Sequence, residues 1–185
     1  MKPRDIPNLL TILRILMVPP VVWLLLQGRY EIALWLFFIA GVTDAVDGFL
    51  AKTFNWESQL GGILDPLADK LLLVSSMVSL GMLGLLPVWL IVLVLLRDVV
   101  IVSGAVAYHF RVAKFEAEPS LVSKTNTLAQ ILLVLSAIGS QVIDFQFDMT
   151  IKILIAVVVL TIVISGVDYV VTWGRRAKQS RINRS

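Results

Sequence analysis

Long apolar runs, separated by short polar or glycine-containing breaks, fill almost the whole chain. A helix needs about 20 predominantly apolar residues to cross a bilayer, and six runs approach this length. They fall near residues 8–27, 31–52, 60–84, 86–109, 125–144 and 149–173. We therefore predict an all-α, polytopic membrane protein, with a six-transmembrane-helix bundle formed by a single domain over residues 1–185.

The composition supports this class. Of the 185 residues, 58% are hydrophobic, and the mean hydropathy of +0.89 is higher than soluble domains normally reach. The chain has no cysteine, which excludes disulfides and thiolate chemistry. Its single histidine, His109, argues against a serine–histidine mechanism and against a histidine-rich zinc site.

Basic residues are distributed unevenly over the predicted ends of the helices. Only Arg29 and Lys152 would lie on one side of the membrane. The other side would carry Lys2, Arg4, Lys52, Arg111, Lys114, Lys124, Arg175, Arg176, Lys178, Arg181 and Arg184. Because lysine and arginine accumulate in cytoplasmic loops, we expect both termini in the cytoplasm.

Four aspartates stand close together within residues 43–70, which read TDAVDGFLAKTFNWESQLGGILDPLADK. An ionised side chain inside a membrane is costly unless a cation or a polar cavity compensates. Asp44 and Asp47 are three residues apart, and Asp65 and Asp69 are four apart, so each pair shares a helix face. Two helices can thus direct four carboxylates into one polar cavity, open to the cytoplasm. Such hard oxygen ligands suit Mg²⁺, Mn²⁺ or Ca²⁺, and paired divalent ions favour displacement at phosphorus. Helix ends whose acids merely face water are the alternative.

A second polar feature precedes them on the first predicted helix. Asn8, Thr11 and Arg14 recur at helical spacing on one face. A polar stripe on an otherwise apolar membrane helix should point into the protein. The alternative is a polar first turn solvated at the membrane interface.

The aspartates belong to a longer spaced pattern, with Pro-Asn-x2-Thr-x2-Arg before it at residues 7–14. The pattern runs Asp44-x2-Asp47-Gly48-x2-Ala51-Lys52-x8-Gly61-x3-Asp65-x3-Asp69. It resembles the signature of the CDP-alcohol phosphotransferase family, membrane enzymes that move a phosphatidyl or similar group from a CDP-activated donor to an alcohol. Family members usually carry arginine where this chain has Lys52, which keeps the charge but loses the planar fork that grips phosphate in two places.

The resemblance implies roles for these residues. Two Mg²⁺ or Mn²⁺ ions would be held by Asp44, Asp47, Asp65 and Asp69, and Asp69 would also take the proton of the attacking hydroxyl. The donor nucleotide would be bound by Asn8, Thr11, Gly48, Ala51, Lys52 and Gly61. The resemblance also implies CDP-diacylglycerol as donor, membrane lipids and a second copy of the chain in a homodimer as partners, and no nucleic acid. It places the protein in a bacterial inner membrane, with the active site facing the cytoplasm.

Two further stretches bear on the acceptor alcohol. Arg97-Asp98-Val99 lies in the fourth run, and Ser123-Lys124-x-Asn126-Thr127-x2-Gln130 begins the fifth. Family members that use glycerol 3-phosphate resemble one another in carrying the motifs REF-x2-TGLR and GK-x-KT at these places. This chain lacks the second arginine of the first motif and the second lysine of the second motif. The pattern instead resembles the members that make cardiolipin from phosphatidylglycerol, and synthesis of phosphatidylglycerophosphate is the alternative. Arg97 and Lys124 are the expected acceptor contacts, since a helix N-terminus with a lysine favours phosphate.

Simpler interpretations stand beside these. For Arg97 the alternative is a structural ion pair, with a partner other than Asp98, because adjacent residues do not share a helix face. The hydroxyl of Ser123 or of Thr125 is expected to cap the fifth helix. Lys70 is expected to extend to the membrane interface rather than to bind phosphate. A cation-coupled transporter is a remote alternative, because its acids should be spread over both halves of the chain.

Overall fold

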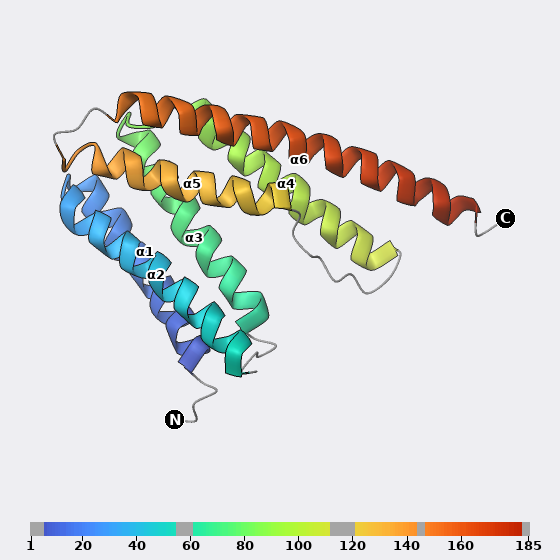
Figure 1. The fold of residues 1–185 in the computed structure, drawn as a ribbon, viewed down its shortest axis with the longest axis horizontal. Helices are drawn as coiled ribbons and strands as arrows, with labels where there is room; N and C mark the ends of the chain where they lie inside the picture. Colours follow the sequence, from blue (N-terminus) through green and yellow to red (C-terminus); the bar gives the residue numbers. More distant parts are fainter. Residues whose placement is uncertain (1–5, 55–60, 112–120, 144–146, 183–185) are drawn as a thin grey trace.

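A computed structural model describes residues 6–54, 61–111, 121–143 and 147–182, which are entirely helical apart from short turns (Figure 1). Within these ranges, the side chains of residues 6–8, 45, 47, 49–52, 61–63, 102, 104–111, 121 and 167–182 lie outside the description. The helices are α1 (Ile6–Leu26), α2 (Tyr30–Phe54), α3 (Gly61–Met82), α4 (Val88–Arg111), α5 (Leu121–Gly139) and α6 (Asp148–Ile182). The prediction of an all-α chain is therefore confirmed for the described residues.

The predicted helix limits need two corrections. The fifth helix runs from Leu121 to Gly139, earlier at both ends than the predicted 125–144. The sixth continues to Ile182, beyond the predicted end at 173. Its last residues are polar but rich in good helix formers such as arginine, lysine and alanine, so hydropathy alone placed its end too early.

Two glycines end helices at the same end of the molecule. Gly28 after α1 and Gly84 after α3 have φ angles of 71° and 74°, a left-handed conformation that glycine adopts without a steric penalty. The next residue then donates a backbone hydrogen bond five positions back: Arg29 to Leu24 at 2.9 Å, and Leu85 to Leu80 at 2.9 Å. This is the Schellman geometry, which satisfies carbonyls that the helix end leaves unpaired.

The helices pack in a defined order. α1 lies against α2 and α3, α5 lies against α6, α2 and α3, and α4 lies against α3 and α6. The α1–α2 and α3–α4 turns, the end of α5 and the start of α6 gather at one end, whereas the start of α1, the end of α2 and the start of α3 lie at another (Figure 1). The predicted aspartate segments of α2 and α3 are therefore neighbours in space.

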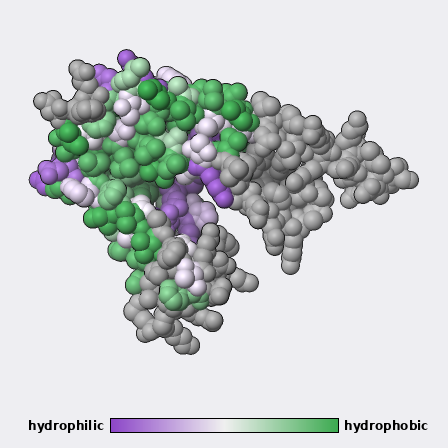
Figure 2. Space-filling view, viewed as in Figure 1, coloured by the Kyte–Doolittle hydropathy of each residue, from purple (hydrophilic) through white to green (hydrophobic). Residues whose placement is uncertain are grey.

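The outer surface is strongly apolar. Leu16, Trp23, Trp35, Val99 and Leu160 are each more than half exposed. By length and composition, three stretches of the described residues could cross a membrane: Leu9–Leu26, Val122–Gly139 and Asp148–Gly166. A complete six-span bundle thus remains a prediction. Figure 2 shows hydrophilic side chains gathered in a recess of this largely hydrophobic surface.

Candidate active site

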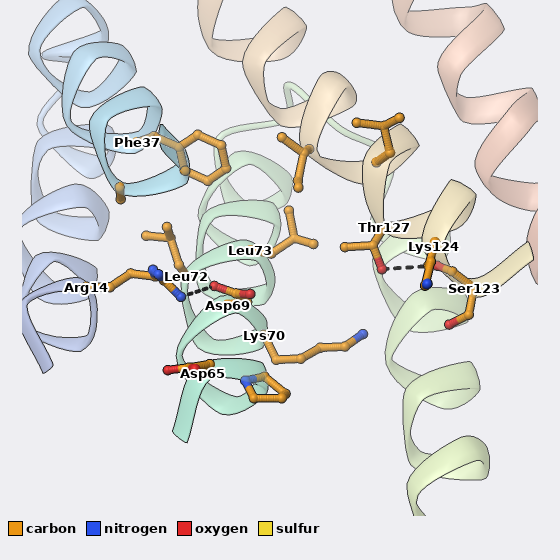
Figure 3. Close-up of a pocket in the computed structure, with 15 residues that line it drawn as sticks. Arg14, Phe37, Asp65, Asp69, Lys70, Leu72, Leu73, Ser123, Lys124 and Thr127 are labelled. Atoms are coloured by element: carbon orange, nitrogen blue, oxygen red, sulfur yellow. Dashed lines mark hydrogen bonds and ion pairs between the residues drawn. The ribbon is translucent and has the colours of Figure 1, made fainter. Parts of the chain in front are cut away.

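Arg14 of α1 lies between carboxylates of two other helices. Its side chain is 1% exposed, and its Nη1 lies 2.7 Å from Asp44 Oδ1 on α2. The same nitrogen pairs with Asp69 Oδ1 on α3 (Figure 3). A charge buried this deeply needs partners of opposite charge, and the two aspartates supply them. Arg14, the last residue of the polar stripe on α1, therefore points inward and joins α1, α2 and α3 at one point.

The third described carboxylate is held by the same stripe. The Thr11 hydroxyl, which is fully buried, donates a hydrogen bond to Asp65 Oδ1. Asp65 lies one helical turn before Asp69 on α3, so both project towards α1. Among the described side chains, Thr11 thus positions a carboxylate, whereas the sequence suggested a contact with the donor nucleotide.

The other predicted donor contacts are only partly described. Gly48 is exposed, and a Cβ placed there would meet nothing within 4 Å, so space adjoins this turn of α2. The side chains of Asn8, Asp47, Ala51, Lys52 and Gly61 lie outside the described residues. Asp47 nevertheless stands in the continuous helix α2, three positions after Asp44.

A cavity of about 580 Å³ opens beside these carboxylates. It is lined by residues of α1, α2, α3 and α5, and Asp65 and Asp69 stand at its polar part. Its apolar walls come from Phe37, Ala40, Gly41, Pro66, Leu72, Leu73, Leu128 and Ile131. A volume of this size is typical of small-molecule sites, and its mixed walls suit a ligand with charged and apolar parts.

Lysines line another part of the cavity. Lys124 on α5 is exposed and borders it, together with Lys70 on α3. Lys70 also forms an ion pair with Asp98 of α4. The expectation that Lys70 extends to the membrane interface is therefore wrong: the side chain turns inward and borders the cavity.

Arg97 lies behind this wall and is not among the residues that line the cavity. It is 8% exposed, and its Nη1 lies 2.9 Å from Asp98 Oδ1. The expectation of separate partners is only partly right: the long Arg97 side chain bends back to Asp98, and Asp98 also has the separate partner Lys70. Its Nη2 also donates to Ser123 Oγ at 2.9 Å and its Nε to Ser165 Oγ at 3.4 Å.

Ser123 and Thr125 do not cap α5, because the helix begins at Leu121 and both residues lie inside its first turns. Ser123 instead accepts the hydrogen bond from Arg97, and thereby ties α5 to α4. This correction follows from the earlier start of the helix. A hydroxyl within a helix lies too late to reach the unpaired first amides.

Two buried amides on α5 belong to the sequence pattern that begins at Ser123, although the pattern indicates no function for them. Asn126 and Gln130 of α5 are fully buried, and Asn126 Oδ1 accepts a hydrogen bond from Thr161 of α6 at 2.9 Å. Among the described residues, the Gln130 amide has no hydrogen-bond partner. The spacing of four residues predicts that both amides lie on one face of α5. The sequence gives no indication that this face packs against α6.

The donor chemistry of the acid cluster fits a hard divalent cation. Asp44 and Asp69 already share one positive charge, that of Arg14, and carboxylate oxygens are the ligands that Mg²⁺ and Mn²⁺ prefer. Among the described side chains, no three acidic, histidine or cysteine groups form a complete metal cage. Asp47, the fourth predicted ligand, is outside that set.

The fold and the cavity together define a class of protein: an apolar helical protein in which carboxylates and cations surround one ligand-sized cavity. The chain belongs to the CDP-alcohol phosphatidyltransferase family, whose model matches residues 4–174. The resemblance inferred from the aspartate spacing is thereby confirmed.

Curated relatives of two kinds are similar to the chain. Cardiolipin synthase (CMP-forming) of Rattus norvegicus is 33% identical over 193 aligned residues, which cover 96% of this chain and 64% of the relative. A probable phosphatidylglycerophosphate synthase of Mycobacterium tuberculosis is 33% identical, covering 90% of this chain and 80% of the relative. The CDP-diacylglycerol–glycerol-3-phosphate 3-phosphatidyltransferase of Aquifex aeolicus is 33% identical, covering 89% and 93%. The chain thus spans 64% of the rat cardiolipin synthase.

Proposed function

We propose that the protein transfers a phosphatidyl group from CDP-diacylglycerol to a hydroxyl of phosphatidylglycerol, which makes it a cardiolipin synthase that releases CMP. The observation that carries this proposal is the convergence of Asp44, Asp65 and Asp69 beside a cavity with basic and apolar walls. Carboxylates suit activation of a hydroxyl and metal binding, cations suit phosphate, and apolar walls suit the acyl part of a lipid.

In this proposal the acid cluster performs two tasks. Asp44, Asp47, Asp65 and Asp69 would hold two divalent ions, Mg²⁺ or Mn²⁺, which when bound neutralise the diphosphate of the donor and the departing CMP. Asp69 accepts the proton of the acceptor hydroxyl. The hydroxyl oxygen attacks the phosphorus that bears the diacylglycerol, and the bond from this phosphorus to the bridging oxygen breaks. Arg14 and Thr11 hold the carboxylates in place.

The donor nucleotide would lie near the start of α1 and the end of α2, against Asn8, Gly48, Ala51, Lys52 and Gly61, while Thr11 acts through Asp65. The open space beside Gly48 supports this position. Lys52 offers one ammonium where the family usually offers a guanidinium, so we infer a single-point contact with the diphosphate.

Synthesis of phosphatidylglycerophosphate from glycerol 3-phosphate is the second candidate. Some relatives similar to the chain are named for the first activity and others for the second. The structure favours the acceptor with fewer charges. Arg97 is engaged by Asp98, Ser123 and Ser165 behind the cavity wall. Asn126, which replaces a lysine of the glycerol 3-phosphate pattern, is buried against Thr161.

The strongly apolar exterior supports placement in a membrane, and we propose the bacterial inner membrane. The α1–α2 turn, which contains Arg29, and the start of α6, which contains Lys152, lie towards one end of the molecule (Figure 1). The more basic segments would then face the cytoplasm with the active site. The exposed apolar helix faces are also compatible with the proposed homodimer.

An assay with purified protein tests the acceptor. We expect CMP release from CDP-diacylglycerol, with Mg²⁺ or Mn²⁺, to depend on phosphatidylglycerol and to yield cardiolipin. If CMP were released with glycerol 3-phosphate but not with phosphatidylglycerol, the second candidate function would be the correct one. Absence of CMP release with every alcohol supplied would contradict the enzyme assignment.

Removal of divalent ions provides a second test. EDTA should abolish CMP release, because three or four carboxylates would then face the diphosphate without metal ions to neutralise it. Added Mg²⁺ or Mn²⁺ should restore it, whereas an equal ionic strength of Na⁺ should not. Activity unchanged after exhaustive chelation would overturn the metal-binding role of the aspartates.

A further inference from the structure

The cavity has walls of opposite charge. Asp65 and Asp69 stand on one side, and Lys70 and Lys124 on another. Asp69 and Lys70 are adjacent in sequence, so their side chains leave α3 about 100° apart. Figure 3 shows the Lys70 ammonium directed away from the Asp69 carboxylate, towards the part of α5 that carries Ser123 and Lys124.

A row of ion-paired groups stands behind Lys70. Asp98 on α4 accepts Lys70 through one carboxylate oxygen and Arg97 through the other, the latter at 2.9 Å. One carboxylate is thus shared by two cations, which leaves an excess positive charge on this wall. The Asp98 side chain is 13% exposed and that of Lys70 is 38% exposed, so the lysine remains accessible while its partner is covered.

Arg97 anchors the row. Its hydrogen bonds to Ser123 on α5 and Ser165 on α6 connect α4 to both helices. A lysine has four flexible side-chain bonds, and holding its ammonium in one place costs conformational entropy unless something else fixes it. Asp98, which is itself held by Arg97, fixes the position of the Lys70 ammonium.

Resting on the proposed function, we propose that Lys70 binds the phosphate of the acceptor and that Asp98 is the positioning residue that holds it there. Phosphatidylglycerol carries a phosphodiester and a free hydroxyl joined by a glycerol unit. With the phosphate at Lys70, that hydroxyl is directed towards the neighbouring Asp69. Lys124 borders the same cavity, whereas Arg97 acts through Asp98 rather than through contact with the substrate.

Kinetics with the acceptor that supports CMP release test this inference. Lys70→Met should raise the KM for the acceptor by about tenfold or more, because a charge-assisted hydrogen bond is lost. The KM for CDP-diacylglycerol should change less than about twofold. Lys70→Arg, which keeps the charge, should recover most of the acceptor affinity. Asp98→Asn should raise the acceptor KM by a smaller factor, about fivefold, since the lysine is present but no longer held.

The controls separate this role from a structural one. Lys152→Met removes an exposed cation on α6 and should leave both KM values unchanged. Equal rises of both KM values, with a lowered melting temperature, would identify the Lys70–Asp98 pair as structural and overturn the inference. An unchanged acceptor KM in Lys70→Met would also overturn it. Because each comparison uses the active wild-type protein, these outcomes differ from failure of the proposed function, in which wild type releases no CMP.

Discussion

Asp69→Asn is expected to reduce acceptor-dependent CMP release by about 100- to 10,000-fold, the range over which general bases contribute. The amide has nearly the shape of the carboxylate but cannot take the proton of the attacking hydroxyl. It also leaves Arg14 with only Asp44 as a described ionic partner. The measurement is the initial rate of CMP release with saturating donor and acceptor.

Binding of divalent ions distinguishes the two proposed tasks of Asp69. In the Asn variant, Mn²⁺ should still raise the melting temperature in part, because Asp44, Asp47 and Asp65 remain. Asp148→Asn, at an exposed position on α6, is the matched control and should keep wild-type activity. If Mn²⁺ no longer raised the melting temperature of Asp69→Asn at all, Asp69 would be mainly a metal ligand rather than a base. Near-normal turnover in this variant would exclude Asp69 as the base.

Arg14→Met should lower both stability and activity. The change removes the only described cation between Asp44 and Asp69, and the two carboxylates then repel each other. These carboxylates are 37% and 42% exposed, so water compensates in part for the lost ion pairs. We therefore expect the free energy of unfolding to fall by about 1–3 kcal/mol, which is less than the full cost of a buried unpaired charge. CMP release should fall by about tenfold or more, since misplaced catalytic groups lower rates steeply.

Thermal unfolding in detergent, with and without Mn²⁺, measures this effect. Mn²⁺ should stabilise Arg14→Met more than wild type, because a bound divalent ion replaces the lost positive charge. Arg14→Lys should fall between the two proteins, and Arg29→Met, which removes an exposed arginine, should resemble wild type. Equal melting temperatures and rates for Arg14→Met and wild type would contradict the role given to this ion pair.

Hydropathy was sufficient to place the helices, because apolar length is a local property of the chain. The runs at 8–27 and 31–52 became α1 and α2 with shifts of a few residues. It was less reliable where polar residues continue a helix, as after residue 173 of α6. Backbone hydrogen bonding and helix propensity, rather than burial in an apolar phase, determine such ends.

The candidate site also has features that the sequence predicts and features that it does not. The spacing of Asp65 and Asp69 placed both on one face of α3, and the polar stripe placed Thr11 and Arg14 inward, since helical period determines both. Their partners could not be predicted. That Thr11 contacts Asp65 depends on how α1 crosses α3, and no sequence spacing specifies this crossing.

The amino-acid sequence was sufficient to assign the class of the protein, through its apolar helices, its aspartate motif in two neighbouring segments and its membership of one family. Which charged side chains pair with each other depends on the packing of the helices. Arg14 pairs with Asp44 and Asp69, and Asp98 links Lys70 to Arg97. Periodicity acts within one helix, whereas these pairs form between helices whose contacts depend on the packing of many side chains at once.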